Sequence, residues 1–291
     1  NMTQRTNVPV TVVGLNARGA ALAQALAAHT AVTVWKGVDP LSEASPVEGV
    51  SHAESAREAF TAAPLIMMCV DDYDHVQRIL EQAEPHLSSV DVVNLTSGTD
   101  DQAEQVAAWL GVRSGDYLDG ALMAHPEHVG DPDTVLVYSG SRSVFDRHAA
   151  TLARLGSPHY LGPDPGTAAL YDVAMLNFAW STLLGFLETA ALLGTAQVSA
   201  TSVSPLLTRW LSGTVTEVIT DYASQVDDRH YPGGQDWLEL DAPLMDHLIE
   251  AGRARGVDTA LPELIRSLTA KGIEAGHGQA SFASLVEVIR G

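Results

Sequence analysis

The first half of the chain alternates short apolar, β-branched runs with amphipathic segments of helical period. Strands are predicted at Val8–Val13, Ala31–Trp35, Leu65–Val70, Val90–Leu95, Tyr117–Met123, Thr134–Ser139 and His159–Leu161. Helices are predicted between the earlier strands, at Ala20–Ala28, Glu54–Ala62, Tyr73–Glu81 and Gln102–Leu110. This alternation is typical of βαβ units, and it predicts an α/β domain with a doubly wound parallel sheet.

The pattern changes after Gly166, where Thr167–Leu193 predicts one unusually long helix. The rest of the chain predicts several amphipathic helices and no convincing strand. We expect breaks between those helices at Pro205, Pro232–Gly234, Pro243, Gly256, Pro262 and Gly276–Gly278. The predicted organisation is therefore an α/β domain over 1–163, an interdomain helix over 164–194 and an all-helical domain over 195–291.

The charge balance and the single cysteine narrow the function classes. Lys plus Arg is 16 and Asp plus Glu is 36, a net charge of −20 that disfavours nucleic acid as a partner. Cys69 has no cysteine to pair with, and no uninterrupted run of about 18 apolar residues predicts a membrane span. The scattered histidines have no metal-ligand spacing, so no metal is expected. We expect a cytoplasmic protein without a membrane partner.

A glycine-rich turn follows the first predicted strand. It reads Gly14-Leu-Asn-Ala-Arg-Gly19 and opens an alanine-rich helix, the context of the G-x-G-x-x-G dinucleotide fingerprint of Rossmann domains. Asn16 replaces the middle glycine, and because asparagine tolerates positive φ the turn is expected to survive. The alternative is a strand–helix turn with no ligand. The residues expected at the cofactor here are Gly14, Leu15, Asn16, Ala17, Arg18 and Gly19.

The end of the second strand bears on cofactor choice. NAD-binding domains carry an acid there for the ribose 2′-hydroxyl, whereas this chain reads Trp35-Lys36-Gly37-Val38. A lysine suits a 2′-phosphate, so NADP(H) is favoured, with Trp35 and Lys36 beside it. Asp39 just beyond leaves NAD(H) open, and a solvated surface lysine is the alternative for Lys36.

Two further strand ends should reach the same edge, since ligands bind at the carboxyl ends of parallel strands. One carries Cys69, Val70 and Asp71; Cys69 itself is expected to pack in the core, because no base is near it in sequence. The other carries Asn94, whose amide is a candidate for holding the nicotinamide ribose and the substrate. Thr96 and Ser97 join it as candidate cofactor residues, and a simple turn cap is the alternative.

Asp172 is an acid in an otherwise apolar stretch of the long helix. Burial would raise its pKa, which would make it a proton donor or a partner for a cationic substrate. The alternative is a structural ion pair with an arginine. Trp180 lies two turns along and is a candidate for stacking on a cation, with core packing as its rival. The remaining candidates for the substrate pocket are Met123, Leu176, Trp210, Trp237 and Met245, although such residues are often core.

Several stretches taken together resemble the imine reductase and reductive aminase family over nearly the whole chain. They are the Gly14 loop, Trp35, Asn94–Gly98, Leu118–Ala124, Gly162–Gly166, Arg253–Val257 and Gly276–Gly278. The resemblance implies an NADPH-dependent enzyme with a Rossmann domain and a helical domain exchanged between two subunits of a homodimer. It also implies active sites between one subunit's nucleotide domain and its partner's helical domain, and a proton-donating or amine-anchoring residue at Asp172.

The chain departs from the family pattern at two cofactor positions and at Trp180. Asn16 replaces the middle glycine of the turn, which puts cofactor affinity in doubt more than function. Asn-Arg-Thr or Asn-Arg-Ser usually follows the tryptophan, and Lys36-Gly37-Val38 replaces it, which puts strict NADPH preference in doubt. Relatives that couple amines to carbonyls can carry a tyrosine where Trp180 stands, so reductive amination is left open.

We therefore expect an oxidoreductase that transfers hydride from a nicotinamide cofactor to the C=N bond of an imine or iminium. A β-hydroxyacid dehydrogenase is the enzymatic rival, but its chemistry needs a lysine on the interdomain helix, and no lysine occurs between Lys36 and Lys271. A cofactor-binding or sensor protein without catalysis is the second rival, suggested by the altered glycine loop.

Overall fold

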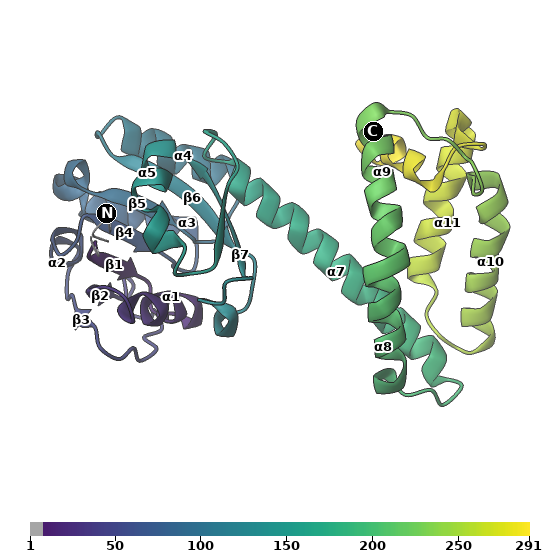
Figure 1. Cartoon of the computed structure of the whole chain (residues 1–291), viewed down its shortest axis with the longest axis horizontal. Coiled ribbons are helices and arrows are strands. Elements are labelled where there is room, and N and C mark those ends of the chain that lie inside the picture. The colour runs from purple at the N-terminus through teal and green to yellow at the C-terminus, as the bar shows by residue number, and fades with distance from the viewer. Residues whose placement is uncertain (1–7) are drawn as a thin grey trace, which may run out of the picture. The chain divides into compact units, whose positions relative to one another are not determined.

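A computed structural model describes residues 8–291, so the first seven residues of the predicted 1–163 domain lie outside the described part. The chain divides into two compact units, one ending at Phe178 and one running from Ala179 to Gly291. The division falls within helix α7 (Thr167–Gly194), which is the predicted long helix. The boundary between the two units therefore falls inside α7, which Figure 1 draws as one continuous helix.

The first unit is built on one sheet with the strand order β3-β2-β1-β4-β5-β6-β7-β8. Its strands are β1 (Val10–Val13), β2 (Val32–Trp35), β3 (Ser51–His52), β4 (Leu65–Met68), β5 (Asp91–Asn94), β6 (Asp116–Leu122), β7 (Val135–Gly140) and β8 (Ser157–Tyr160). The prediction missed β3, which is two exposed residues long and buries no apolar side chain.

The predicted parallel sheet is confirmed except at one pair, β6 with β7, which is antiparallel. The link between these strands contains only a short 3₁₀ turn, η2 (Pro126–His128). A parallel pair needs a crossover connection, usually an α-helix that covers the sheet, and this link contains no α-helix. The chain therefore returns directly, and the strand direction reverses.

Helices cover both faces of the sheet, because alternate strand residues point to opposite sides. Val12 packs in a core with α1 (Ala17–Ala27) and residues of α5 (Arg142–Arg147) and α6 (Ala149–Leu152). Val13 packs in a second core with α2 (Ala56–Thr61), α3 (Tyr73–Gln82), α4 (Asp100–Gly111) and the start of α7. The 3₁₀ segment η1 (Glu84–Ser89) follows α3. Both faces are buried, as a doubly wound domain requires.

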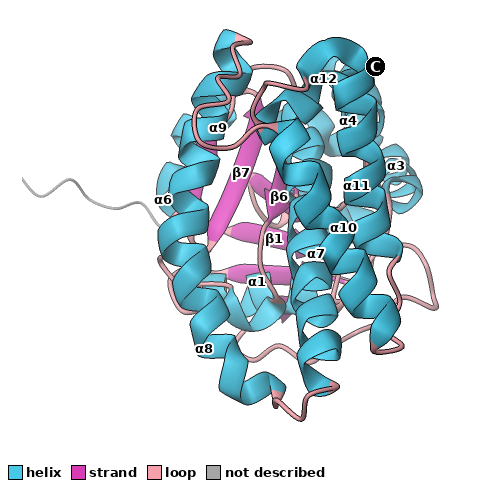
Figure 2. Cartoon of the chain, turned by 90° about the vertical axis from the view of Figure 1, so that its right-hand side faces the viewer, coloured by secondary structure: helices cyan, strands magenta, loops and turns pink. Residues whose placement is uncertain are grey.

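The second unit is helical, as predicted (Figure 2). After α7 come α8 (Ala200–Trp210), η3 (Leu211–Val215), α9 (Thr216–Asp228), α10 (Leu238–Ala254), α11 (Ala260–Gly272), η4 (Ile273–His277), η5 (Phe282–Ser284) and α12 (Leu285–Arg290). Gly256, at φ +68°, follows the end of α10, and Gly276, at φ +97°, kinks η4.

The predicted breaks at three prolines are wrong. Pro205 lies inside α8, Pro243 lies inside α10 and Pro262 lies in the first turn of α11. A proline in the first turn lacks only an N–H that has no helical partner in any case. Pro205 and Pro243 each stand at the sixth residue of their helix, where one backbone hydrogen bond is lost and the packing of the bundle maintains the helix.

Helix α7 leaves many large apolar side chains uncovered. They include Leu170, Tyr171, Val173, Met175, Leu176, Trp180, Leu183, Leu184 and Leu187, each at least 41% exposed. By length and composition α7 is apolar enough to cross a membrane, although polar residues interrupt it and a core helix of a soluble protein can meet the same criterion. An exposed apolar surface of this extent indicates that something covers it.

Candidate active site

Backbone hydrogen bonds align the ends of four parallel strands at one edge of the sheet. The amide of Gly14 donates to the carbonyl of Trp35 at 2.8 Å, and the amide of Cys69 donates to the carbonyl of Val13 at 2.8 Å. The amide of Leu95 donates to the carbonyl of Met68 at 2.7 Å. The segments after β1, β2, β4 and β5 that the sequence singled out therefore meet at this edge.

The turn after β1 depends on two glycines. A Cβ at Gly14, which has φ +109°, would lie 2.0 Å from the carbonyl oxygen of Cys69. A Cβ at Gly19 would lie 2.1 Å from the carbonyl oxygen of Gly14. Asn16 needs no positive φ: it is extended, at φ −60°, and its Oδ1 accepts from the amide of Gly19 at 2.9 Å. Asparagine fits here as a helix N-cap, so the turn survives for a different reason from the one expected.

A small pocket lies between this turn and the neighbouring strand ends. It is lined by Gly14, Leu15, Asn16, Lys36, Ser42, Glu43, Val70 and Asp71. The first turn of α1 carries no acidic residue, Ala17 there is exposed, and Arg18 stands next to it. Because a helix N-terminus attracts anions, these residues fit the pyrophosphate of a dinucleotide.

Trp35 has a different place from the one expected. Its side chain is buried among apolar residues of the α2–α3 core, and its backbone carbonyl binds Gly14. Lys36 is exposed and lines the pocket, with Nζ 3.5 Å from the carbonyl oxygen of Pro40. Glu43 lines the same pocket and was not singled out from the sequence.

His75 binds Asp39, the acid because of which NAD(H) remained a possible cofactor. Its Nε2 lies 3.0 Å from Oδ2 of Asp39, and its Nδ1 lies 2.7 Å from Oδ1 of Asp72. The hydrogen bonds to Asp39 and Asp72 raise the pKa of His75, and those with His75 lower the pKa of Asp39. The Asp39 carboxylate is thus held by a neighbouring helix, while Lys36 is the cation that lines the pocket, together with the carboxylates of Glu43 and Asp71.

Asn94 is fully buried, with both ends of its amide engaged. Its Nδ2 donates to the hydroxyl of Tyr117 at 2.9 Å, and its Oδ1 accepts from the amide of Thr96 at 3.1 Å. Direct contact between Asn94 and a cofactor or substrate therefore stays a prediction. The hydroxyl of Thr96 accepts in turn from the amide of Val70 at 3.0 Å, which joins the ends of β4 and β5.

Behind Asn94 lies a buried carboxyl group that sequence reasoning missed. Oδ2 of Asp119 accepts from the hydroxyls of Tyr73 and Tyr117, each at 2.5 Å. Burial is the main cause that raises the pKa of Asp119 to about 7, and the charge of Asp172 raises it further. The only available signal was a lone acid within an apolar strand, the same signal that identified Asp172.

Asp172 is buried in the first unit, at 7% exposure. Burial raises its pKa, and the nearby charge of Arg18 opposes that shift. No cation lies within ion-pair distance of it among residues 8–291, so the structural ion pair is not formed within the described chain. Arg18 is held by Ser97 instead, its Nη1 donating to Oγ at 3.0 Å. Arg18, Ser97 and Asp172 thus lie around one edge of the sheet.

Cys69 belongs to the core, as expected. It is buried, and burial raises the pKa of its thiol to about 11. A thiol that stays protonated at neutral pH is a poor nucleophile. Within residues 8–291 no group of three or more His, Cys, Asp or Glu side chains could hold a metal ion.

The predicted substrate-pocket residues are distributed over both units. Met123 is half-buried against the ends of β6 and β7, and Leu176 is 45% exposed. In the helical unit, Trp180 and Trp210 are 68% and 60% exposed. Trp237 is the half-buried N-cap residue of α10, and the sulfur of Met245 accepts from the hydroxyl of Thr269.

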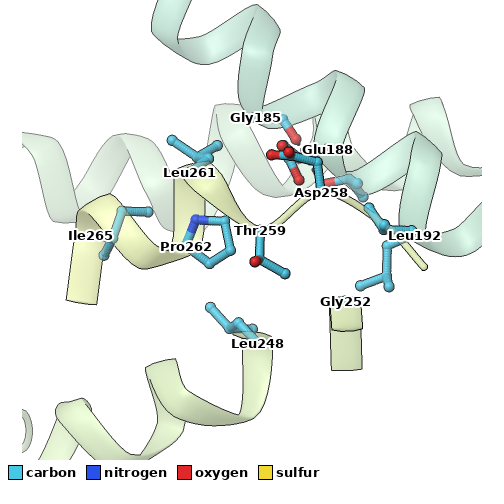
Figure 3. Close-up of a pocket in the computed structure, with 12 residues that line it drawn as sticks. Gly185, Glu188, Leu192, Leu248, Gly252, Asp258, Thr259, Leu261, Pro262 and Ile265 are labelled. Atoms are coloured by element: carbon cyan, nitrogen blue, oxygen red, sulfur yellow. Dashed lines mark hydrogen bonds between the residues drawn. The ribbon is translucent and has the colours of Figure 1, made fainter. Parts of the chain in front are cut away.

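A separate cavity of about 220 Å³ lies within the helical unit, between α7, α10 and the start of α11 (Figure 3). It is lined by Gly185, Glu188, Thr189, Leu192, Leu248, Gly252, Val257, Asp258, Thr259, Leu261, Pro262 and Ile265. None of the predicted pocket residues lines it, so this cavity gives no support to the sequence-based substrate pocket.

Two family models match the chain in succession. Residues 9–162 match the NAD binding domain of 6-phosphogluconate dehydrogenase, and residues 164–291 match the C-terminal domain of NADPH-dependent reductive aminase-like proteins. The junction between the two matches lies near the predicted boundary at 163.

Individual relatives match over almost the full length. An NADPH-dependent reductive aminase from Aspergillus oryzae is 32% identical over 284 residues, 96% of each chain. The reductive aminase from Aspergillus terreus, solved with NADPH4, cyclohexanone and allyl amine, is 32% identical with a TM-score of 0.86, covering 98% of this chain and 100% of that one. The V8 variant of an imine reductase from Myxococcus stipitatus, solved with NAD⁺, is 27% identical with a TM-score of 0.88, covering 98% and 100%.

Proposed function

Because the chain belongs to the family of NADPH-dependent reductive aminases and imine reductases, we propose that it reduces the C=N bond of an imine or iminium to an amine. The observation that carries this function is Asp172, a buried carboxyl group without an ion-pair partner in the described chain, at the strand edge that fits a dinucleotide. Small-molecule carbonyl compounds and amines are its partners. A preformed imine and an imine made from amine and ketone are the two forms of substrate to compare.

NADP(H) is the cofactor that the residues favour. Lys36 is exposed at the pocket, while the competing acid Asp39 is held by His75. NAD(H) is the alternative, because Glu43 lines the same pocket and a carboxylate suits a ribose hydroxyl. When bound, NADPH supplies the hydride that adds to the imine carbon.

Asp172 is proposed to act on the imine nitrogen. Burial raises the pKa of its carboxyl group, which favours the protonated form that can give a proton to the nitrogen as the C–H bond forms. In its ionised form the same group stabilises a cationic iminium. The nearby charge of Arg18 opposes the rise of the pKa.

The test is Asp172→Asn, which keeps the shape and removes the transferable proton. With a cyclic imine such as a pyrroline, followed by nicotinamide absorbance, kcat should fall by about 10²–10⁴-fold, the usual contribution of general acid catalysis. The Kd of NADPH should not change. Asp71→Asn, at an exposed carboxylate lining the cofactor pocket, should instead affect the Kd of NADPH before kcat. A folded Asp172→Asn protein with wild-type turnover would exclude the catalytic role.

A second copy of the chain is proposed to cover the exposed apolar surface of α7. Leu183, Leu184 and Leu187 extend this surface into the helical unit, where Trp180 and Trp210 are also exposed. A homodimer with exchanged helical domains would bury these side chains and bring two tryptophans to a substrate site. The single cysteine, free and buried, suits a reducing compartment such as the cytoplasm.

A further inference from the structure

A row of polar residues crosses the middle of the sheet behind the proposed site. Asn94 on β5 is in register with Asp119 on β6, and Asp119 is in register with Ser139 on β7. All three are buried, at 0%, 1% and 0% exposure. Ser139 binds the start of α7, because its Oγ accepts from the amide of Ala168 at 2.8 Å and donates to the carbonyl of Pro165 at 3.2 Å. The strand residues around Asn94 and Asp119 on this face belong to an apolar core, so packing does not explain these two polar side chains.

Within this row, the hydroxyl of Tyr117 bridges the side chains of Asp119 and Asn94. The hydroxyl of Tyr117 donates to Asp119 at 2.5 Å and accepts from Asn94 at 2.9 Å. Since an amide is planar, this bond and the one from the Thr96 amide together fix its orientation. Tyr117 therefore transmits the position of Asp119 to Asn94.

From Asn94 the hydrogen bonds continue to Arg18 at the strand edge of the proposed site. Asn94 holds Thr96, and the adjacent Ser97 binds the guanidinium of Arg18, which also reaches the carbonyl of Leu95 at 3.5 Å. Arg18 is the cation that acts on Asp172. The loop of residues 95–98 thus links Asn94 to Arg18, whose charge lowers the pKa of Asp172.

The row also costs stability, which argues for a role. Oδ1 of Asp119 is buried without a hydrogen-bond partner among the described residues. Leaving a buried polar atom unpaired destabilises a protein by about 1–3 kcal/mol. An apolar residue at this position would avoid that cost, so stability alone does not account for Asp119.

We propose that Asp119 and Tyr117 are positioning residues of the reduction, acting through Asn94 on the loop of residues 95–98 that holds Arg18 at the strand edge of the proposed site. The inference rests on the proposed function, because the step they support is hydride transfer to the imine. Tyr73, the other donor to Asp119, has no bond to Asn94 and helps to hold the carboxyl group in place.

The test compares Tyr117→Phe with Tyr138→Phe. Tyr138 is likewise a fully buried tyrosine in the sheet, but its hydroxyl has no partner among residues 8–291. Single-turnover hydride transfer at saturating NADPH and cyclic imine should slow about three- to tenfold in Tyr117→Phe, the effect of one lost hydrogen bond, and not in Tyr138→Phe. The Kd of NADPH should rise in Tyr117→Phe, because the loop carries the candidate cofactor residues Thr96 and Ser97, and should not change in Tyr138→Phe; saturating NADPH removes this effect from the measured rate. Asp119→Asn, which keeps an acceptor oxygen, should retain more activity than Asp119→Leu.

A double-mutant cycle separates positioning from general damage. If Tyr117 acts only through Asn94, Asn94→Ala with Tyr117→Phe should be no slower than Asn94→Ala alone. Additive losses, or equal rates for Tyr117→Phe and Tyr138→Phe, would overturn the proposal while leaving the function intact. A wild-type protein that reduces no imine would overturn the function itself, and the positioning role with it.

Discussion

The charge on Asp119 is set by its surroundings and not by its sequence neighbours. Burial opposes ionisation of the carboxyl group, whereas the hydroxyls of Tyr117 and Tyr73 favour it. The effect of burial is the larger one, so the pKa rises to about 7. The groups that face it are these two tyrosines and Asp172. Burial therefore favours the protonated form of this carboxyl group well above the pH at which an exposed aspartate ionises.

This shift predicts a pH dependence of stability. In the unfolded chain Asp119 has its ordinary pKa near 3.8, so between about pH 4 and pH 7 the folded state binds the extra proton. The contribution of Asp119 to the free energy of unfolding should be largest below pH 4 and should be lost as the pH rises through 7. Urea unfolding of wild type and Asp119→Asn across this range should show the difference. Asp116→Asn, at the exposed start of the same strand, should retain the wild-type slope.

At the scale of elements, the β1–α1 turn depends on a backbone conformation that other residues rarely adopt. Gly14→Ala adds a Cβ that would meet the Cys69 carbonyl at 2.0 Å, in addition to the penalty of φ +109°. We expect a loss of stability well beyond the roughly 1–2 kcal/mol of a positive φ, and loss of NADPH binding. Gly49→Ala has a positive φ of +72° and no atom within 4 Å, so it isolates the conformational penalty. Equal melting temperatures for the two variants would contradict the close-packing argument.

Helix α3 controls the loop after β2 through His75. His75→Gln should release Asp39, whose carboxylate would then repel a 2′-phosphate near Lys36. The Kd of NADPH should rise more than the Kd of NADH, as measured by cofactor fluorescence. His52→Gln, at an exposed position on β3, is the matched control. The His75–Asp39 pair should also give the wild type a pH-dependent selectivity. Its preference for NADPH should weaken as the pH rises through the raised pKa of His75, since the neutral imidazole holds Asp39 less strongly.

At the scale of the whole molecule, the exposed surface of α7 predicts self-association. Leu187→Glu introduces a charge at a side chain that is 60% exposed, and burying that charge in a dimer would be costly. Light scattering at micromolar concentration should show a dimer for wild type and a larger monomer fraction for the variant. Val112→Glu, at an apolar residue of the first unit that is 80% exposed, should remain dimeric. A fully active wild-type monomer would remove the proposal.

The sequence alone predicted most of the elements and the strand edge at which several of the candidate residues meet. Apolar periodicity predicted the α/β and helical parts because side-chain spacing reports the local conformation directly. The glycine turn and Asp172 were found because a residue type there conflicts with its local pattern. The carboxyl-end rule then placed Asn94 at the same edge of the sheet, which the strand register confirms.

Only the tertiary structure decided which distant groups meet. His75 and Asp39 are 36 residues apart, and Tyr73 and Asp119 are 46 apart, yet both pairs are in hydrogen-bond contact. The antiparallel β6–β7 pair brings Ser139 into register with Asp119, and no local pattern indicates that register. Burial and partners set the protonation of Asp119 and Cys69, and both arise from packing between elements far apart in the chain.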